Sequence, residues 1–191
     1  MRYVAIDFET ANPARASACA LGIVASDGTG ITESWYRLIH PPEMRFDPNC
    51  VRVNHITPDM VENEPEFPFF YKDIFSLLDG AIVFAHNAGF DMAVLSAMLE
   101  CYALKKPRFR YGCTVKLSRT LWPNMLNHKL NTVAGNLGFD FQHHQALADA
   151  AACEYIVRCA LRETGAPDAE TMMQRVKQSL SAFADLGKKQ N

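Results

Sequence analysis

The sequence predicts an α/β domain in which helices flank a central mixed five-stranded sheet. Five short apolar, β-prone segments carry this prediction: 3–6, 19–26, 31–39, 81–85 and 110–114. The first three follow one another, and the last two alternate with helical segments, which is typical of a sheet covered by helices. With 191 residues, 49% of them hydrophobic, the chain is long enough to bury one substantial core.

The N-terminal segments are predicted to form a meander of three strands. Residues 3–6 (YVAI) are apolar and run into Asp7-Phe8-Glu9, as expected of a buried strand with acids at its C-terminal end. Strands over 19–26 and 31–39 follow, and the intervening Asp27-Gly28-Thr29-Gly30 is a typical hairpin turn.

The remainder of the main domain is predicted to be largely helical. Residues 40–66 are rich in Pro and polar residues and should be mostly loop, with a short helix starting near Thr57-Pro58. Helices are expected over 67–78, 88–102, 115–121, 130–137 and 146–162. The last is Ala-rich and apolar around its whole circumference, which predicts a well-buried helix.

Residues 166–191 are predicted to form a C-terminal helical tail behind a main domain of residues 1–165. Apolar side chains recur at helical spacing between 168 and 186, which predicts a terminal amphipathic helix. The same tail contains QSLSAF (178–183), which loosely resembles the sliding-clamp-binding peptides of replication proteins. Such peptides bind in an extended form, so the helix and the clamp interpretations conflict.

Composition and charge exclude several classes of protein. Six scattered cysteines without a Cys-x-x-Cys pair fit neither a zinc site nor a disulfide framework and favour reduced thiols in a cytoplasmic protein. The N-terminus is not a signal peptide, and no apolar run approaches the roughly 18 residues that a membrane span needs. The net charge of −2 neither supports nor excludes nucleic-acid binding, because bound cations can make the local charge of a carboxylate-lined site positive.

Three acidic side chains lie where predicted strands end. Asp7 and Glu9 are two residues apart on one strand, so both point to the same face and can reach one metal ion. Asp91 follows the apolar strand 81–85 and falls in the first turns of the next helix, where an acid also suits the helix dipole. Strand ends and helix starts converge at one edge of such a sheet.

A fourth acid lies at the start of the Ala-rich helix. Asp149 occupies its first turns and His144 the loop before it, so both side chains can face one cleft. An acid in an otherwise apolar helix needs a partner, and a metal ion is a suitable one. His143 belongs to no motif and is expected to be an ordinary surface or core histidine.

Three motifs, taken in order, resemble those of the DEDDh (DnaQ-like) group of 3′→5′ exonucleases. They are Asp7-x-Glu9-Thr10, Asn87-Ala88-x-Phe90-Asp91 and His144-x-Ala146-x-x-Asp149. The group includes the epsilon subunit of bacterial DNA polymerase III, the exonuclease domain of the Gram-positive replicative polymerase, exonuclease X and ribonuclease T. The resemblance covers residues 2–161 and implies a ribonuclease-H-like fold.

The resemblance also implies a mechanism with two Mg²⁺ or Mn²⁺ ions. Asp7 would bridge the two ions, while Glu9 and Asp149 would complete the one that holds the attacking water. Asp91 would serve the second ion. His144 would be the general base, a role that suits an imidazole with a pKa of about 6.5.

Five residues are candidates for binding the terminal nucleotide. Thr10 and Phe90 correspond to family positions that hold it, and Asn87 lies in the same motif as Phe90. The loop 51–57 corresponds to a family segment that often reads Val/Ile-His-Gly-Ile-Thr. Here Asn54 fills the His position and His55 the Gly position.

DNA 3′ ends are favoured as the substrate, with a role in proofreading or DNA repair. Residues 113–119 and 121–123 resemble the epsilon, Gram-positive and exonuclease X branch. An exoribonuclease that trims RNA or short oligonucleotides is the alternative, because ribonuclease T shares the same residues. A non-catalytic nucleic-acid or polymerase-binding module and an enzyme for small phosphodiesters are two further readings. The expected protein partner is a DNA polymerase or a sliding clamp. No association with a membrane is expected, and the protein should be a monomer or a homodimer.

Overall fold

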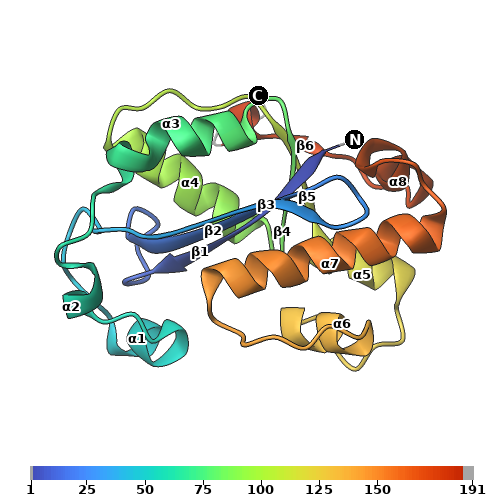
Figure 1. Cartoon of the computed structure of the whole chain (residues 1–191), viewed down its shortest axis with the longest axis horizontal. Coiled ribbons are helices and arrows are strands. Elements are labelled where there is room, and N and C mark those ends of the chain that lie inside the picture. The colour runs from blue at the N-terminus through green and yellow to red at the C-terminus, as the bar shows by residue number, and fades with distance from the viewer. Residues whose placement is uncertain (1, 187–191) are drawn as a thin grey trace.

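The computed structural model describes residues 2–186 and contains one sheet with helices on both faces (Figure 1). The strands are β1 (Tyr3–Thr10), β2 (Ala18–Ser26), β3 (Ile31–Leu38), β4 (Ile82–Ala85), β5 (Arg110–Cys113) and β6 (Ser181–Ala182). Their order across the sheet is β3-β2-β1-β4-β5-β6. The meander β1–β2–β3 is antiparallel, β4 and β5 continue it in parallel with β1, and β6 is antiparallel to β5. The mixed α/β prediction is confirmed, but the sheet formed by residues 2–186 has six strands rather than five.

The helices lie close to their predicted positions. They are α1 (Pro48–Asn54), α2 (Pro58–Val61), α3 (Phe67–Leu78), α4 (Gly89–Cys101), α5 (Thr114–Leu121), α6 (Leu130–Asn136), α7 (Ala146–Thr164) and α8 (Ala169–Arg175). Helix α1 falls in a region predicted to be loop; the Asp47 side chain caps it by accepting from the Asn49 N–H, and Pro48 occupies its first turn. No helix among residues 2–186 is long and apolar enough to cross a membrane.

The two faces of the sheet are covered by different helices. Helices α3 and α4 pack on one face, and α5 to α8 pack on the other (Figure 1). Strand β1 alternates between these layers: Val4, Ile6 and Phe8 belong to the first core, whereas Tyr3 and Ala5 belong to the second. This alternation turns the next odd-numbered side chains of β1 toward the α7 side.

A glycine lets helix α7 approach the sheet closely. Gly22 on β2 pairs with Asp7 on β1, so the two residues share the face that α7 covers. A Cβ atom at Gly22 would lie 2.3 Å from the Ala146 carbonyl oxygen and 2.5 Å from the Leu147 nitrogen. The first turn of α7 therefore lies directly on the glycine backbone, next to the end of β1.

The predicted tail helix is wrong beyond Arg175. Helix α8 ends there, Lys177 has a φ of 55°, and the chain then extends into β6 along the edge of the sheet. Phe183 is fully buried and stacks on Phe109 at a ring-centroid distance of 4.5 Å. Burying this ring favours the extended path over a continued helix. It also leaves the ring inaccessible to a sliding clamp, and residues 187–191 of the predicted tail lie outside the described residues.

Candidate active site

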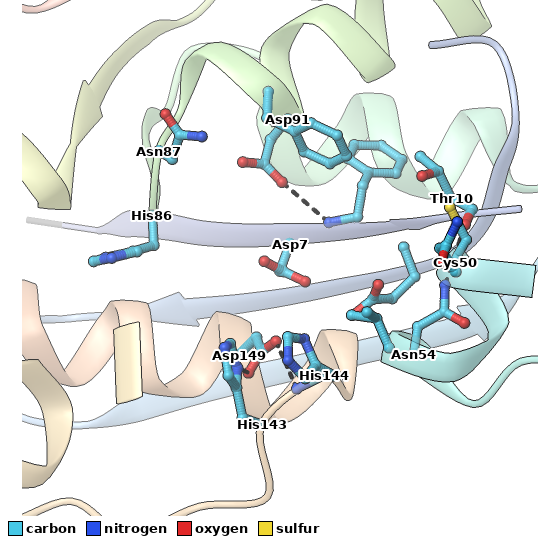
Figure 2. A pocket seen from close by; sticks show the side chains of 15 residues that line it. Asp7, Thr10, Cys50, Asn54, His86, Asn87, Asp91, His143, His144 and Asp149 are labelled. Carbon is cyan, nitrogen blue, oxygen red and sulfur yellow. Dashed lines mark hydrogen bonds and ion pairs between the residues drawn. The ribbon is translucent and has the colours of Figure 1, made fainter. Parts of the chain in front are cut away.

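A hollow of about 390 Å³ lies where the C-terminal end of β1 meets the first turns of α4 and the loop before α7 (Figure 2). Nine of the ten predicted site residues line it: Asp7, Glu9, Thr10, Asn54, Asn87, Phe90, Asp91, His144 and Asp149. The tenth, His55, is exposed at the end of α1 with a φ of 60° and instead lines a second hollow of about 320 Å³. The two hollows share Asn54 and His144.

Three carboxylates form a set of ligands suitable for a metal ion. One oxygen from each of Asp7, Glu9 and Asp149 lies within 4.8 Å of the others. Hard divalent cations such as Mg²⁺ prefer oxygen ligands of this kind. Asp91 lies on the other side of Asp7 from Asp149 (Figure 2), and its Oδ1 accepts a hydrogen bond of 3.1 Å from the Phe8 backbone N–H.

The proximity of these carboxylates is electrostatically unfavourable without a cation. Burial, followed by the charges of Asp91, Asp149 and Glu9, raises the pKa of Asp7 well above its usual range. Burial and Asp149 raise the pKa of Glu9 to about 7, and burial raises that of Asp91 to about 8. A bound divalent ion would compensate this repulsion, so the residues fit the metal ions that the motifs imply.

Both oxygens of Asp149 are held by hydrogen bonds. The His143 Nδ1 lies 2.8 Å from Oδ1, and the His144 backbone N–H donates to Oδ2 over 3.1 Å. An ionised carboxylate only accepts, so His143 donates from Nδ1. The expectation that His143 is an ordinary surface or core residue is therefore wrong: it lines the hollow and orients one of the acids.

The His144 side chain sits between the acids and the second hollow. Its backbone has a φ of 68°, and its ring stacks on that of His143 at a centroid distance of 3.8 Å. Burial, followed by the nearby His143, lowers the pKa of His144. The imidazole is consequently neutral at pH 7 and able to accept a proton.

His86 fixes the turn that carries Asn87 and leads into α4, where Asp91 lies. Its Nε2 lies 2.9 Å from the His128 carbonyl oxygen, and its Nδ1 lies 2.9 Å from the Thr114 hydroxyl. A carbonyl only accepts, so Nε2 donates and the Thr114 hydroxyl donates to Nδ1. Burial lowers the His86 pKa to about 4, which keeps this neutral form at physiological pH. No motif in the sequence indicates this role for His86.

Two of the residues predicted to bind substrate have well-defined contacts within the protein. Asn54 is buried, donates to the Thr10 carbonyl oxygen over 3.1 Å and accepts from the Ile56 N–H over 3.0 Å. Its side chain therefore ties the end of α1 to the end of β1. Phe90 is partly exposed, and the guanidinium carbon of Arg15 lies 4.7 Å from its ring centroid.

Helix α1 supplies further residues of the hollow that the sequence does not predict. Asn49, Cys50 and Val53 line the hollow opposite β1. The Asp47-Pro48 pair could have indicated this helix, because a capping acid followed by proline is a common helix start.

Comparisons with known proteins identify the family to which this chain belongs. A protein-family model described as Exonuclease (RNase_T) matches residues 4–157. DNA polymerase III PolC-type of Oceanobacillus iheyensis is 33% identical over 117 residues, which are 61% of this chain and 8% of that protein. DNA polymerase III subunit epsilon of Treponema pallidum is 29% identical over 136 residues, which are 70% of this chain and 63% of that protein. The matches thus span less than two thirds of these relatives.

Solved structures of exonucleases share the ribonuclease-H-like fold. Exonuclease X in complex with 5′ overhanging duplex DNA superposes with a TM-score of 0.72 at 24% identity, covering 91% of this chain and 99% of the other. The nuclease domain of 3′hExo, a DEDDh family member bound to rAMP, gives a TM-score of 0.73 at 18% identity, covering 85% and 92%. Because the exonuclease family model matches most of its length, this chain belongs to the DEDDh (DnaQ-like) family of 3′→5′ exonucleases.

Proposed function

We propose that this exonuclease removes nucleotides one at a time from the 3′ ends of DNA in a reaction that depends on divalent metal ions. The convergence of the Asp7, Glu9 and Asp149 carboxylates within 4.8 Å, in a hollow that His144 also lines, carries this proposal. Four acids and one neutral imidazole supply the groups needed for hydrolysis by a water molecule, without a covalent nucleophile.

Each residue has a distinct task in this proposal. Asp7, Glu9, Asp91 and Asp149 would hold two Mg²⁺ or Mn²⁺ ions, which would stabilise charge on the attacking and leaving oxygens. His144 accepts a proton from the attacking water, and its lowered pKa keeps it in the accepting form at neutral pH. His143 keeps the Asp149 carboxylate in place while this proton moves.

DNA is the substrate that we infer, in proofreading or repair. The names of the curated relatives, DNA polymerase III PolC-type and DNA polymerase III subunit epsilon, support this choice. One structural relative is bound to 5′ overhanging duplex DNA. Another is bound to rAMP, so RNA is the specific alternative.

The test is the cleavage of 5′-labelled and 3′-labelled oligonucleotides, DNA and RNA in parallel, with Mg²⁺, Mn²⁺ or EDTA. We expect a 5′-labelled DNA strand to shorten stepwise, and a 3′-labelled strand to release labelled mononucleotide at once. EDTA and Asp7→Asn should each abolish both signals. Asp73→Asn, which removes an exposed carboxylate on α3, should cleave like the wild type.

Each other outcome has a definite meaning. Faster cleavage of RNA would replace DNA by RNA as the substrate. Failure to cleave either polymer by folded, metal-supplied protein would overturn the proposal and favour a binding module. Cleavage that persists in Asp7→Asn would show that the carboxylates have another task.

A further inference from the structure

An arginine that belongs to none of the three motifs stands at the rim of the active-site hollow. Arg15 is exposed, and its guanidinium carbon lies 4.7 Å from the ring centroid of Phe90, which lines the hollow. A guanidinium stacked on an aromatic ring is held in one plane while its N–H groups stay free at the edges. No ion pair within residues 2–186 involves Arg15. Its positive charge is therefore available to a ligand.

The loop that carries Arg15 is braced by several hydrogen bonds. The Asn12 side chain accepts from the Ala14 N–H over 2.9 Å and donates to the Arg45 carbonyl oxygen over 2.7 Å. The Ser17 hydroxyl donates to the backbone carbonyls of Asn12 and Ala14, and both Asn12 and Ser17 are buried. The backbone on either side of Arg15 is thus fixed before any substrate arrives.

The ring over which Arg15 lies belongs to the residue next to one of the acids. Phe90 precedes Asp91 at the start of α4, so the stacked guanidinium and the carboxylate belong to the same side of the hollow.

The chemistry of the proposed reaction indicates which part of a substrate lies on the side of the hollow formed by Phe90 and Asp91. Asp91 lies on the opposite side of Asp7 from His144 and Asp149 (Figure 2). The water that His144 deprotonates enters on the His144 side, and in an in-line displacement the leaving oxygen departs on the opposite side of the phosphorus. The leaving oxygen belongs to the shortened strand. This strand therefore extends out of the hollow on the Asp91 side, past Phe90.

We propose that Arg15, stacked on Phe90, is a subsite for the phosphodiester of the retained strand next to the scissile bond. This subsite rests on the proposed function and adds a substrate-positioning residue to it. A planar guanidinium can donate two parallel hydrogen bonds to the oxygens of a phosphodiester. Arg15 contacts no atom that reacts; it holds the strand in register so that the terminal phosphodiester reaches the acids.

The test compares a long and a minimal substrate in three variants. The long substrate is single-stranded DNA, and the minimal one is the p-nitrophenyl ester of thymidine 5′-monophosphate, which has no phosphodiester beyond the scissile one. The variants are Arg15→Ala, Arg15→Lys and, as a matched control, Arg37→Ala. The guanidinium carbon of Arg37 lies 5.3 Å from the ring centroid of Trp35, and both residues belong to β3. Arg37 is not among the residues that line the hollow.

Arg15→Ala should raise KM for the DNA strand by about tenfold or more with little change in kcat, because it removes a charge-assisted contact to a non-reacting phosphate. It should leave both constants for the ester unchanged. Arg15→Lys should restore part of the loss, since it keeps the charge without the two-pronged geometry. Arg37→Ala should match the wild type on both substrates.

Salt dependence provides a readout that does not need turnover. In fluorescence anisotropy with a labelled DNA strand and Ca²⁺ in place of Mg²⁺, Arg15→Ala should reduce the slope of log Kd against log salt by about 0.7, the value for one phosphate contact on a single strand. The Arg37→Ala slope should equal that of the wild type.

Three results would overturn the subsite: an unchanged KM and salt slope in Arg15→Ala, an equal loss on the ester, or an equal loss in Arg37→Ala. An equal loss on the ester would mean that Arg15 acts on the acids. Absence of hydrolysis of both substrates by the wild type would instead refute the proposed function, and the anisotropy slopes would still decide whether Arg15 contacts a phosphate.

Discussion

At the scale of single residues, two neighbouring histidines each form a hydrogen bond with Asp149. The backbone N–H of His144 and the Nδ1 of His143 each hold one oxygen of this carboxylate. The motif identifies His144 but not His143, because the contact between His143 and Asp149 depends on the path of the loop before α7, in which His144 has a φ of 68°. A partner of this type, which fixes the geometry of a metal-binding carboxylate, is commonly as important as the ligand itself.

Replacing His143 should weaken metal binding more than it slows the chemical step. His143→Ala removes one of the two donors that orient Asp149, and we expect the apparent affinity for Mg²⁺ to fall about 10- to 100-fold. His143→Asn should rescue most of this loss, because its amide nitrogen can occupy the place of Nδ1. Activity titrated against Mg²⁺ concentration, with kcat taken at saturation, separates the two effects. Equal Mg²⁺ affinities in His143→Ala and the wild type would remove His143 from the site.

At the scale of secondary-structure elements, the site depends on how closely α7 approaches β2. Asp149 reaches Asp7 because Gly22 presents no side chain to the first turn of the helix. The sequence predicts both the strand and the helix, yet no periodicity indicates which strand residue lies beneath a helix terminus. A glycine within a strand does suggest a close backbone approach, and here that approach sets the separation of the acids.

Gly22→Ala should therefore impair activity as well as stability. The new methyl group would overlap the Ala146 carbonyl, so the start of α7 must move and take Asp149 with it. We expect kcat to fall at least about tenfold and the free energy of unfolding to fall by about 1–3 kcal/mol. Gly30→Ala is the control, because a Cβ atom there meets nothing within 4 Å. Urea unfolding and steady-state cleavage of DNA measure the two effects, and a fully active, stable Gly22→Ala would contradict the argument.

The C-terminal segment shows where periodicity alone is insufficient. Met172 and Val176 occupy buried positions of α8 and its end, as the helical spacing predicts. The spacing continues to Phe183, but that ring is buried by stacking on Phe109, a contact across more than seventy positions of the chain. Such long-range packing outweighs local propensity and cannot be read from a window of neighbouring residues.

Phe183→Ala should destabilise the fold without altering the chemistry. Loss of the buried ring should lower the free energy of unfolding by about 3–5 kcal/mol. Below the unfolding transition kcat should stay at the wild-type value, because β6 lies at the edge of the sheet and adds no residue to the hollow. Phe69→Ala, at a phenylalanine that is 75% exposed, should change stability by less than about 0.5 kcal/mol. A similar small change for Phe183→Ala would mean that the edge strand does not contribute to stability.

At the scale of the whole molecule, the acids that we assign to the reaction oppose folding when no metal is present. Burial and mutual repulsion raise the pKa of Asp7, that of Glu9 to about 7 and that of Asp91 to about 8. Between pH 5 and 8 these carboxyl groups consequently bind more protons in the folded chain than in the unfolded chain, where they are already ionised. Their contribution to the free energy of unfolding therefore falls as the pH rises through this range, and it opposes the contribution of His86 and His144, whose pKa values are lowered.

Urea unfolding in EDTA at pH 5, 6, 7 and 8 measures this fall, which we expect to reach at least about 1 kcal/mol, since one pKa unit corresponds to about 1.4 kcal/mol. Mg²⁺ should restore stability most at pH 8, because it binds the folded chain with its carboxylates ionised. Asp7→Asn removes one of the interacting charges, so its metal-free stability should depend less on pH and should exceed that of the wild type at pH 8. Asp73→Asn should retain the wild-type dependence. If Asp7→Asn and the wild type lost stability equally between pH 5 and 8, the carboxylate cluster could not be the source of the pH dependence.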